Sequence, residues 1–356
     1  MVSVTTVTAH PWRRLGNRGD IAEFSLCRPD NEGMIMRLTR EGMPRRAVLP
    51  LMAAVPASLA ASGTALASSR SPRRDLCEPM STTDADWQPV VDVLGRKGTL
   101  SPDRTVYRIP LPRNDLTVTS HGVVIKAGFA LGGYATWAMY EDMVLLMGDL
   151  VVTEPELQAV TDALQAHGVA QTAVHKHLLE HSPNLWWTHI HAMGDPRALA
   201  RGLKAALDVT GTPPLGPPGP PRPIDLDTES IDSALGRKGT NDGGIYKFGI
   251  GRAETIVEDD YHLPVALGLS TALNFQPLGE GRAAINGDFV MVRKEIQHVI
   301  QALRAGGISI IELHNHGLGE RPRLFYMHFW AVGDGVTLAH ALRPAVDACN
   351  LVPPAR

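Results

Sequence analysis

The sequence predicts an α+β protein made of two tandem copies of one unit, each with a β-rich start followed by a strand, a helix, two strands and a helix. The main reason is an internal repeat, in which residues 173–191 recur as residues 312–330. Three histidines of each stretch align without a gap: His175, His177 and His189 with His314, His316 and His328. The hexapeptide Leu-Gly-Arg-Lys-Gly-Thr also occurs twice, at 94–99 and 235–240. Identity at all three histidines favours a preserved site over a chance match.

The first unit, residues 87–209, opens with a short amphipathic helix at 87–94. Gly95 is expected to end this helix, because glycine tolerates the left-handed conformation of a helix C-cap. Apolar and β-branched runs predict strands at 106–110, 116–119, 123–125, 143–147, 169–177 and 185–192. Helical periodicity predicts two further helices, at 156–167 and 196–207. A turn at 182–183 would join the last two strands into a hairpin.

The second unit, residues 229–349, repeats this order. Gly287-Asp288 matches Gly148-Asp149, and a helix at 295–305 matches the one at 156–166. Residues 210–228 are proline-rich and predict an extended linker. Two further stretches are expected outside the units: a linker at 68–86 and a short tail at 350–356.

The composition is that of a globular protein, with 44% hydrophobic and 20% charged residues in 356. A net charge of −3 gives no electrostatic footprint for nucleic acid, so no such partner is expected. The three cysteines lie far apart, which argues against a disulfide framework and a thiolate metal site. No nucleophile elbow, P-loop or dinucleotide fingerprint is present.

The N-terminal region predicts export. Residues 1–42 have no clear apolar period and are expected to be an unstructured extension or to follow a misplaced start codon. Residues 43–67 read as a signal peptide, with Arg45-Arg46 before an apolar segment and Ala65-Leu66-Ala67 at its end. The adjacent arginines indicate the twin-arginine route. The alternatives are a buried helix or a membrane anchor, but the apolar segment is short for a membrane span, so none is expected after signal removal.

The repeated histidines predict a metal site, because residues i and i+2 of a strand share a face. His175 and His177 would share one face, and His189 and His191 the same face of the paired strand, so that four imidazoles converge. The second unit offers His314, His316 and His328, with Glu312 as a possible fourth ligand because Trp330 replaces His191. The first cluster is therefore expected to bind more tightly. The full set of candidate ligands is His175, His177, His189, His191, His314, His316, His328 and Glu312.

Imidazole with an optional carboxylate suits zinc, copper, iron or nickel, and does not suit calcium or magnesium. The expected cofactor is therefore zinc or another transition metal. The alternative is a polar sheet face whose histidines bond to backbone and water. Asp149 and Asp288 follow glycines at expected strand ends before helices, where they could orient a ligand histidine or simply cap a turn.

These motifs, in this order and in both units, resemble the LppY/LpqO family, a domain-of-unknown-function family of exported bacterial proteins. The resemblance covers about residues 87–349 and rests on the paired hexapeptides, the Gly-Asp pairs, and His-x-His followed by proline and a third histidine. It implies export and names no reaction. The sequence departs in one respect from the lipid anchoring that the family names imply: no lipobox cysteine follows the signal, since Cys77 lies ten residues beyond Ala67.

Three functions are compatible with these residues. The first is an exported protein of the cell envelope, periplasm or exterior that binds a transition metal or a small polar ligand. The second is a metal-dependent hydrolase of the cell envelope, with Glu180 or Glu312 as base. The third is a non-catalytic structural or interaction module. Binding is favoured, because Glu180 aligns with Gly319 and Glu312 with Ala173, so the units share no base. The sequence assigns neither catalytic residues nor an oligomeric state.

Overall fold

The structure is a computed structural model that describes residues 76–216 and 222–354. These residues belong to one compact unit, Ser69–Arg356. The predicted extension at 1–42 and signal peptide at 43–67 lie outside the described residues, as do parts of both linkers. Among the described residues, no helix has the length and apolar character needed to cross a membrane.

Each repeat forms one six-stranded antiparallel sheet, and the strand order is the same in both. In the first repeat the order is β1 (Thr99–Leu100), β2 (Val106–Pro112), β5 (Gly132–Met139), β6 (Val144–Thr153), β9 (Leu185–Gly194) and β7 (Ala170–His175). In the second it is β10 (Thr240–Asp242), β11 (Ile245–Gly251), β14 (Ser270–Gly279), β15 (Arg282–Val292), β17 (Leu324–Asp334) and β16 (Ser309–His314). The predicted α+β duplication is therefore confirmed.

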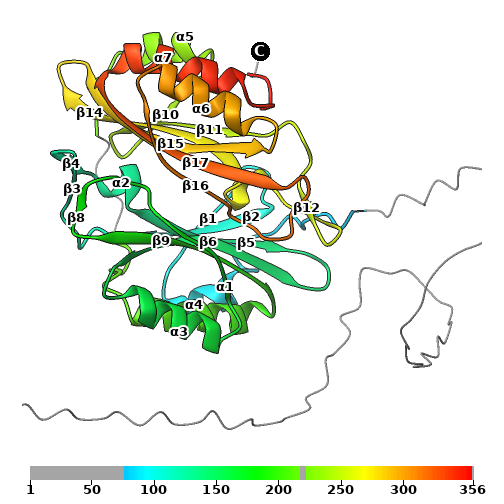
Figure 1. Ribbon diagram of the computed structural model, residues 1–356. Coiled ribbons are helices and arrows are strands. Elements are labelled where there is room, and N and C mark those ends of the chain that lie inside the picture. Colours follow the sequence, from blue (N-terminus) through cyan, green and yellow to red (C-terminus); the bar gives the residue numbers. More distant parts are fainter. Residues whose placement is uncertain (1–75, 217–221, 355–356) are drawn as a thin grey trace, which may run out of the picture. The chain divides into compact units, whose positions relative to one another are not determined.

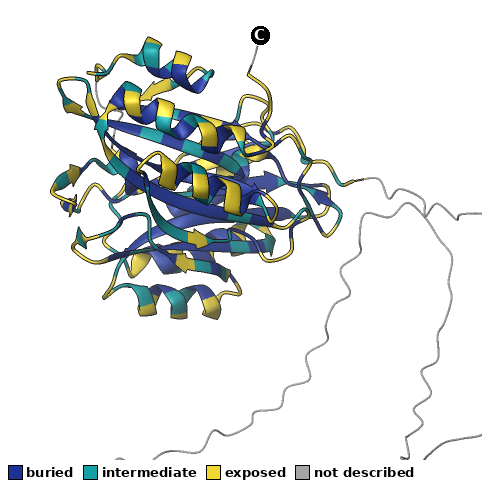
Figure 2. Cartoon of the chain, turned by 45° about the horizontal axis from the view of Figure 1, so that its top comes forward, coloured by how far each residue is buried: buried dark blue, intermediate teal, exposed yellow. Residues whose placement is uncertain are grey.

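The two sheets face each other and helices cover their outer faces (Figure 1). The helices of the first repeat are α1 (Gln88–Leu94), α3 (Leu157–Ala166) and α4 (Pro196–Asp208). Those of the second are α5 (Thr228–Leu235), α6 (Ile296–Ala305) and α7 (Gly335–Asp347). Figure 2 shows the strands largely buried and the helices exposed along one side only. This pattern is that of amphipathic helices packed on a sheet.

Shorter elements lie between the main strands. In the first repeat these are β3 (Val118–Ser120), β4 (Val123–Ile125), β8 (His181–Ser182) and the short helix α2 (Ala127–Ala130). In the second they are β12 (Val257–Glu258), β13 (Tyr261–His262) and the 3₁₀ turn η1 (Val265–Leu267). The β12–β13 pair and η1 occupy in the second repeat the place that β3, β4 and α2 occupy in the first, although only β3 and β4 join a further strand, β8, to form a small sheet.

The ends of the equivalent helices are built alike. The Asp195 side chain accepts a hydrogen bond from the amide of Ala198 at the start of α4, and Asp334 does the same for Thr337 at the start of α7. Such an N-cap contributes about 1 kcal/mol. At the other end, Gly95 closes α1 in the left-handed region, as predicted, with a φ of 64°. The same local chemistry thus fixes the same helix positions in both copies.

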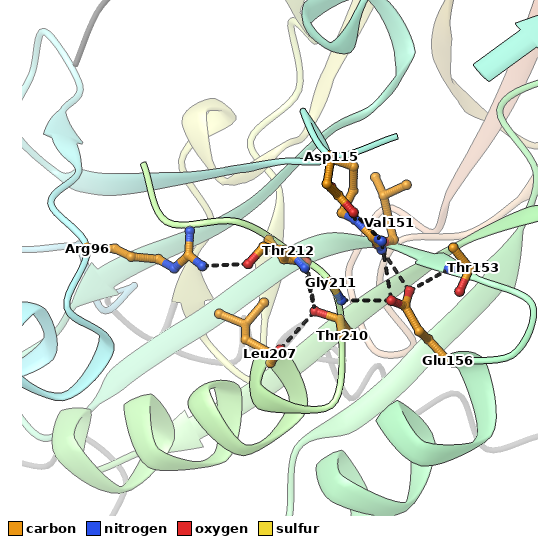
Figure 3. A network of polar contacts seen from close by, with 10 residues as sticks. Arg96, Asp115, Val151, Thr153, Glu156, Leu207, Thr210, Gly211 and Thr212 are labelled. Atoms are coloured by element: carbon orange, nitrogen blue, oxygen red, sulfur yellow. Dashed lines mark hydrogen bonds and ion pairs between the residues drawn. The ribbon is translucent and has the colours of Figure 1, made fainter. Parts of the chain in front are cut away.

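A buried arginine ties the sheet to the helices in each repeat. Arg113, 1% exposed, pairs with Asp115 and Glu156, and also donates to the Val151 carbonyl. Figure 3 shows Glu156 also accepting from the amides of Thr153 and Gly211. The second repeat contains the equivalent Arg252, paired with Glu254 and Glu295. These networks hold the strand that carries each Gly-Asp pair against the following helix.

The start of the proline-rich linker is also fixed to the first repeat. Arg96 donates to the carbonyl of Thr212 (Figure 3) and to that of Pro213. The basic side chain of the repeated hexapeptide, which follows Gly95, thus makes a structural contact with the linker. At the other end of the repeat, Thr82 donates from its amide to the Arg104 carbonyl, so part of the stretch predicted as the first linker packs on the fold.

Candidate metal centre

Strand register places the aspartates beside the histidines. On the inner face of the first sheet, Asp149 of β6 lies opposite His189 of β9, and His189 lies opposite Ala173 of β7. Two residues along the same pair of strands, His175 lies opposite Trp187. The second sheet has the same row, with Asp288 of β15 opposite His328 of β17. Each sheet therefore presents an aspartate and its histidines on the face that meets the other repeat.

The expectation of strand-end aspartates was wrong. Asp149 and Asp288 lie in the middle of β6 and β15, and the preceding glycines do not end the strands. Gly287 is required by space, because a Cβ there would collide with the Ala272 carbonyl oxygen of the neighbouring strand. The aspartates touch the histidines directly: Asp149 Oδ2 is 3.2 Å from His177 Nε2, and Asp288 Oδ2 is 3.1 Å from His316 Nε2.

The expectation of two separate clusters was also wrong, because the repeats bring their histidines together. The ring centroids of His175 and His314, which are equivalent residues, lie 4.1 Å apart. His189 of the first repeat stands 3.7 Å from His316 of the second, and His177 stands 3.9 Å from His328. Six histidines and two aspartates thus form one centre, hereafter the histidine–aspartate cluster: His175, His177, His189, His314, His316, His328, Asp149 and Asp288.

Two of the predicted ligands do not join this cluster. His191 shares the face of His189, but its Nε2 lies 2.8 Å from Glu258 Oε2 of β12. Glu312 lies opposite His328, and its Oε2 accepts a hydrogen bond of 2.7 Å from the amide of Lys176. Each therefore has a partner of its own, so the four-imidazole site of the first unit does not form.

The cluster contains buried polar atoms without hydrogen-bond partners. His175 is fully buried, and His189 and His328 are 3% exposed. Among the described residues, the unpartnered atoms in the cluster are Asp149 Oδ1, His175 Nδ1, His189 Nε2, Asp288 Oδ1, both nitrogens of His314, and His328 Nε2. An unsatisfied buried polar atom costs about 1–3 kcal/mol. A bound ion or polar ligand at this point could satisfy these atoms.

Two backbone contacts fix the protonation of key imidazoles. His189 Nδ1 lies 3.2 Å from the Gly148 carbonyl oxygen, and His328 Nδ1 lies 2.8 Å from that of Gly287. A carbonyl only accepts, so Nδ1 carries the hydrogen and donates it, and the lone pair is on Nε2. In both residues Nε2 is the unpartnered atom. A backbone carbonyl behind an imidazole is the usual orientation device of a metal-ligating histidine.

Burial sets the ionisation of the cluster. It lowers the pKa of His175, His177, His189, His314 and His316 well below the usual histidine range, and the neighbouring imidazoles add to this effect. Burial also raises the pKa of the Asp149 carboxyl, and it raises that of Asp288 to about 6. These five imidazoles are therefore neutral at pH 7, which is the form that binds metal.

The donor set fits a transition metal. Three overlapping sets have ligand atoms within 4.8 Å of one another: His175, His314 and His328; His189, His314 and His316; and Asp149, His175 and His189. Imidazole nitrogen with carboxylate oxygen is the ligand chemistry of zinc and other divalent transition metals. The donor atoms of the cluster therefore have the chemical type, burial and spacing that a transition-metal ion requires.

A cavity of about 670 Å³ opens between the sheets and reaches the cluster. Asp149, His177 and His189 line it from the first repeat, and the equivalent Asp288, His316 and His328 line it from the second. His175 and His314 are not among its lining residues. The cavity therefore reaches the cluster through these six residues, whereas His175 is fully buried.

The cavity walls carry two basic residues that motif reasoning did not select. Arg108 of β2 and Lys247 of β11 both line the cavity. The guanidinium of Arg108 lies 3.7 Å from the ring centroid of Tyr134. The sequence did contain a signal for these two residues, because Arg108 and Lys247 directly follow the matched Tyr107 and Tyr246. Neighbouring residues of a strand point to opposite faces, so the two basic residues lie on the inner face of their strands.

Comparisons with known proteins identify two copies of one family domain. The sequence matches the Domain of Unknown Function (DUF1259) over residues 88–209 and 229–348. No curated protein matches the chain. A solved structure of the trimeric bacterial microcompartment shell protein PduB is similar at 12% identity and a TM-score of 0.20, covering 73% of this chain and 98% of that one. EtuB from Clostridium kluyveri is similar at 12% identity and a TM-score of 0.17, covering 71% and 89%. Similarity this low carries no argument about function.

Proposed function

The chain belongs to the Domain of Unknown Function (DUF1259) family, and we propose that its function is to bind a transition-metal ion, zinc first among them, in the histidine–aspartate cluster. The observation that carries this proposal is the state of His189 and His328. Each holds its Nδ1 against a backbone carbonyl and leaves Nε2 buried without a partner. A purely structural histidine would satisfy both nitrogens.

The test is the metal content of the full chain, purified without a histidine tag and without chelator, measured by inductively coupled plasma mass spectrometry. We expect stoichiometric transition metal, retained after gel filtration. A matched control is His340→Ala, because His340 is exposed on α7 outside the cluster. Protein that holds no more metal than a variant lacking His175, His177, His314 and His316 would remove the proposal and leave a metal-free polar pocket.

Metal-dependent hydrolysis is the second candidate, and the cavity favours it. A bound transition-metal ion supplies a Lewis acid that polarises water or a substrate oxygen. Arg108 on the cavity wall offers positive charge for holding an anionic substrate, whereas the ammonium of Lys247 is already paired with Asp242. The test is hydrolysis of phosphate-ester and carboxylate-ester substrates by the metal-loaded chain, with Arg108→Gln expected to raise KM more than it lowers kcat. If the loaded protein turns over none of these substrates, binding remains the function.

Export and the finer family name are also part of the proposal. We place the protein in the cell envelope or outside the cell, delivered by a twin-arginine signal at 43–67, and we place it with the LppY/LpqO proteins. The support is the Arg45-Arg46 pair, the apolar segment and the Ala65-Leu66-Ala67 exit. N-terminal sequencing of the exported form should begin near Ser68. Recovery of cytoplasmic protein that still starts at Met1 would overturn it.

A further inference from the structure

We propose that the histidine–aspartate cluster holds two metal ions, and that each ion takes its third histidine from the opposite repeat. This inference rests on the proposed metal-binding function and adds its stoichiometry and ligand pairing. Site A consists of His175, His177 and Asp149 of the first repeat with His328 of the second. Site B consists of His314, His316 and Asp288 of the second repeat with His189 of the first.

Site B is supported by direct geometry. The ligand atoms of His189, His314 and His316 lie within 4.8 Å of one another, close enough to share one ion. The Oδ2 atom of Asp288 lies 3.1 Å from His316 Nε2 and 4.0 Å from His314 Nε2. Three imidazoles and one carboxylate therefore converge, which gives the four donors of a tetrahedral transition-metal site.

Site A is its counterpart under the internal duplication. His175 Nε2 lies 2.9 Å from His177 Nε2, and Asp149 Oδ2 lies 3.2 Å from the same nitrogen. The ring of His328 stands 3.9 Å from that of His177. Every ligand of site B thus has an equivalent residue in site A with a matching neighbour. Because the two sets share no residue, both sites can be filled at once.

The crosswise pairing follows from the orientation of the third histidine. His189 is 3.7 Å from His316 of the other repeat but 4.7 Å from His175 of its own, measured between ring centroids. His328 is 3.9 Å from His177 but 4.7 Å from His314. In each residue Nδ1 is held by a carbonyl of its own repeat, so the free Nε2 lies on the far side of the ring. Neither site is complete without both repeats.

The competing arrangement keeps each ion within one repeat. It draws on Asp149, His175 and His189, whose ligand atoms also lie within 4.8 Å of one another. The two arrangements assign His328 differently: crosswise pairing puts it with His175 and His177, whereas same-repeat pairing puts it with His314 and His316. This difference can be measured.

The experiment is native mass spectrometry of the untagged full chain at a zinc concentration that saturates the wild type. We expect two ions in the wild type and one in each double variant, His175→Ala with His177→Ala or His314→Ala with His316→Ala. Adding His328→Ala to the first pair should leave one ion, because all three residues belong to site A. Adding it to the second pair should leave none, because both sites are then broken. His340→Ala should keep two ions.

The outcomes separate the two proposals. No ion in the wild type overturns metal binding itself. One ion per chain leaves metal binding standing and overturns the two-ion site. Two ions with the opposite response to His328→Ala overturn the crosswise pairing, because His328 would then serve the ion of its own repeat. Circular dichroism monitors folding, and glutamine replaces alanine in any variant that fails to fold, since it keeps a polar side chain of similar length.

Discussion

Replacing His314 by leucine should stabilise the metal-free protein. Both ring nitrogens of His314 are buried and lack partners, at an expected cost of about 1–3 kcal/mol each. Leucine has nearly the same volume and keeps the packing against His175 and His328, and such a swap costs less than about 1.5 kcal/mol. The free energy of unfolding without metal should therefore rise by roughly 0.5–6 kcal/mol, the cost of the two nitrogens less that of the swap. A residue kept for ligand binding at the expense of stability is expected at a functional site.

The assay is urea unfolding of wild type and His314→Leu, each with chelator and with excess zinc. Wild type should gain about 2.7 kcal/mol for each bound ion when free zinc is 100 times the dissociation constant of that site, and the variant should gain less. The dependence on urea concentration should be the same in both proteins, so that a midpoint shift reports stability alone. If metal-free His314→Leu is less stable than metal-free wild type by more than about 1 kcal/mol, the unpartnered nitrogens carry no such cost and the reasoning fails.

Two other perturbations test the same energetics. Acidifying the metal-free protein below pH 6.5 should lower its free energy of unfolding. The imidazoles of the unfolded chain take up protons in this range, whereas the buried imidazoles of the folded protein stay neutral because their pKa values are lowered. The free energy of unfolding should fall by about 1.4 kcal/mol per pH unit for each extra proton that the unfolded chain binds. The raised pKa values of the Asp149 and Asp288 carboxyls act in the opposite direction, but the histidines outnumber these two aspartates. A urea midpoint that is no lower at pH 5.5 than at pH 7 would contradict this prediction. Arg252→Met should cost roughly 3–5 kcal/mol, because Glu295 would remain buried and without its charged partner. Arg343→Met should change the urea midpoint little, because Arg343 is partly exposed and its ion pair with Asp347 lies at the surface. Equal effects of the two substitutions would refute the buried-network role.

Much of the fold could be predicted from local patterns. Alternation along β9 correctly placed His189 on one face, and the repeated hexapeptides identified equivalent helix ends. These features depend on residues within a few positions of one another. The misplaced strand ends show the limit: glycine before Asp149 and Asp288 suggested a break, but the structure uses Gly287 because the neighbouring strand leaves no room for a Cβ. A close approach between strands is not visible in either strand's own sequence.

The composition of the site was harder to predict, because it depends on how the two sheets pack. Nothing local indicates that His175 of one repeat would stack on its equivalent, His314, of the other. His191 was expected to be a ligand because it shares a face with His189. Its partner, Glu258, lies 67 positions away, in β12 of the other repeat. Long-range pairing of this kind follows from burial across the whole unit, which a motif does not encode.

The central claim is that a transition metal occupies the space between the two sheets. X-ray diffraction from crystals of the untagged protein, collected on both sides of the zinc absorption edge, tests it most directly. We predict anomalous peaks about 2.0–2.1 Å from Nε2 of His189 and from Nε2 of His328. Absence of any peak in the histidine–aspartate cluster, with water molecules hydrogen-bonded to these nitrogens instead, would contradict the account.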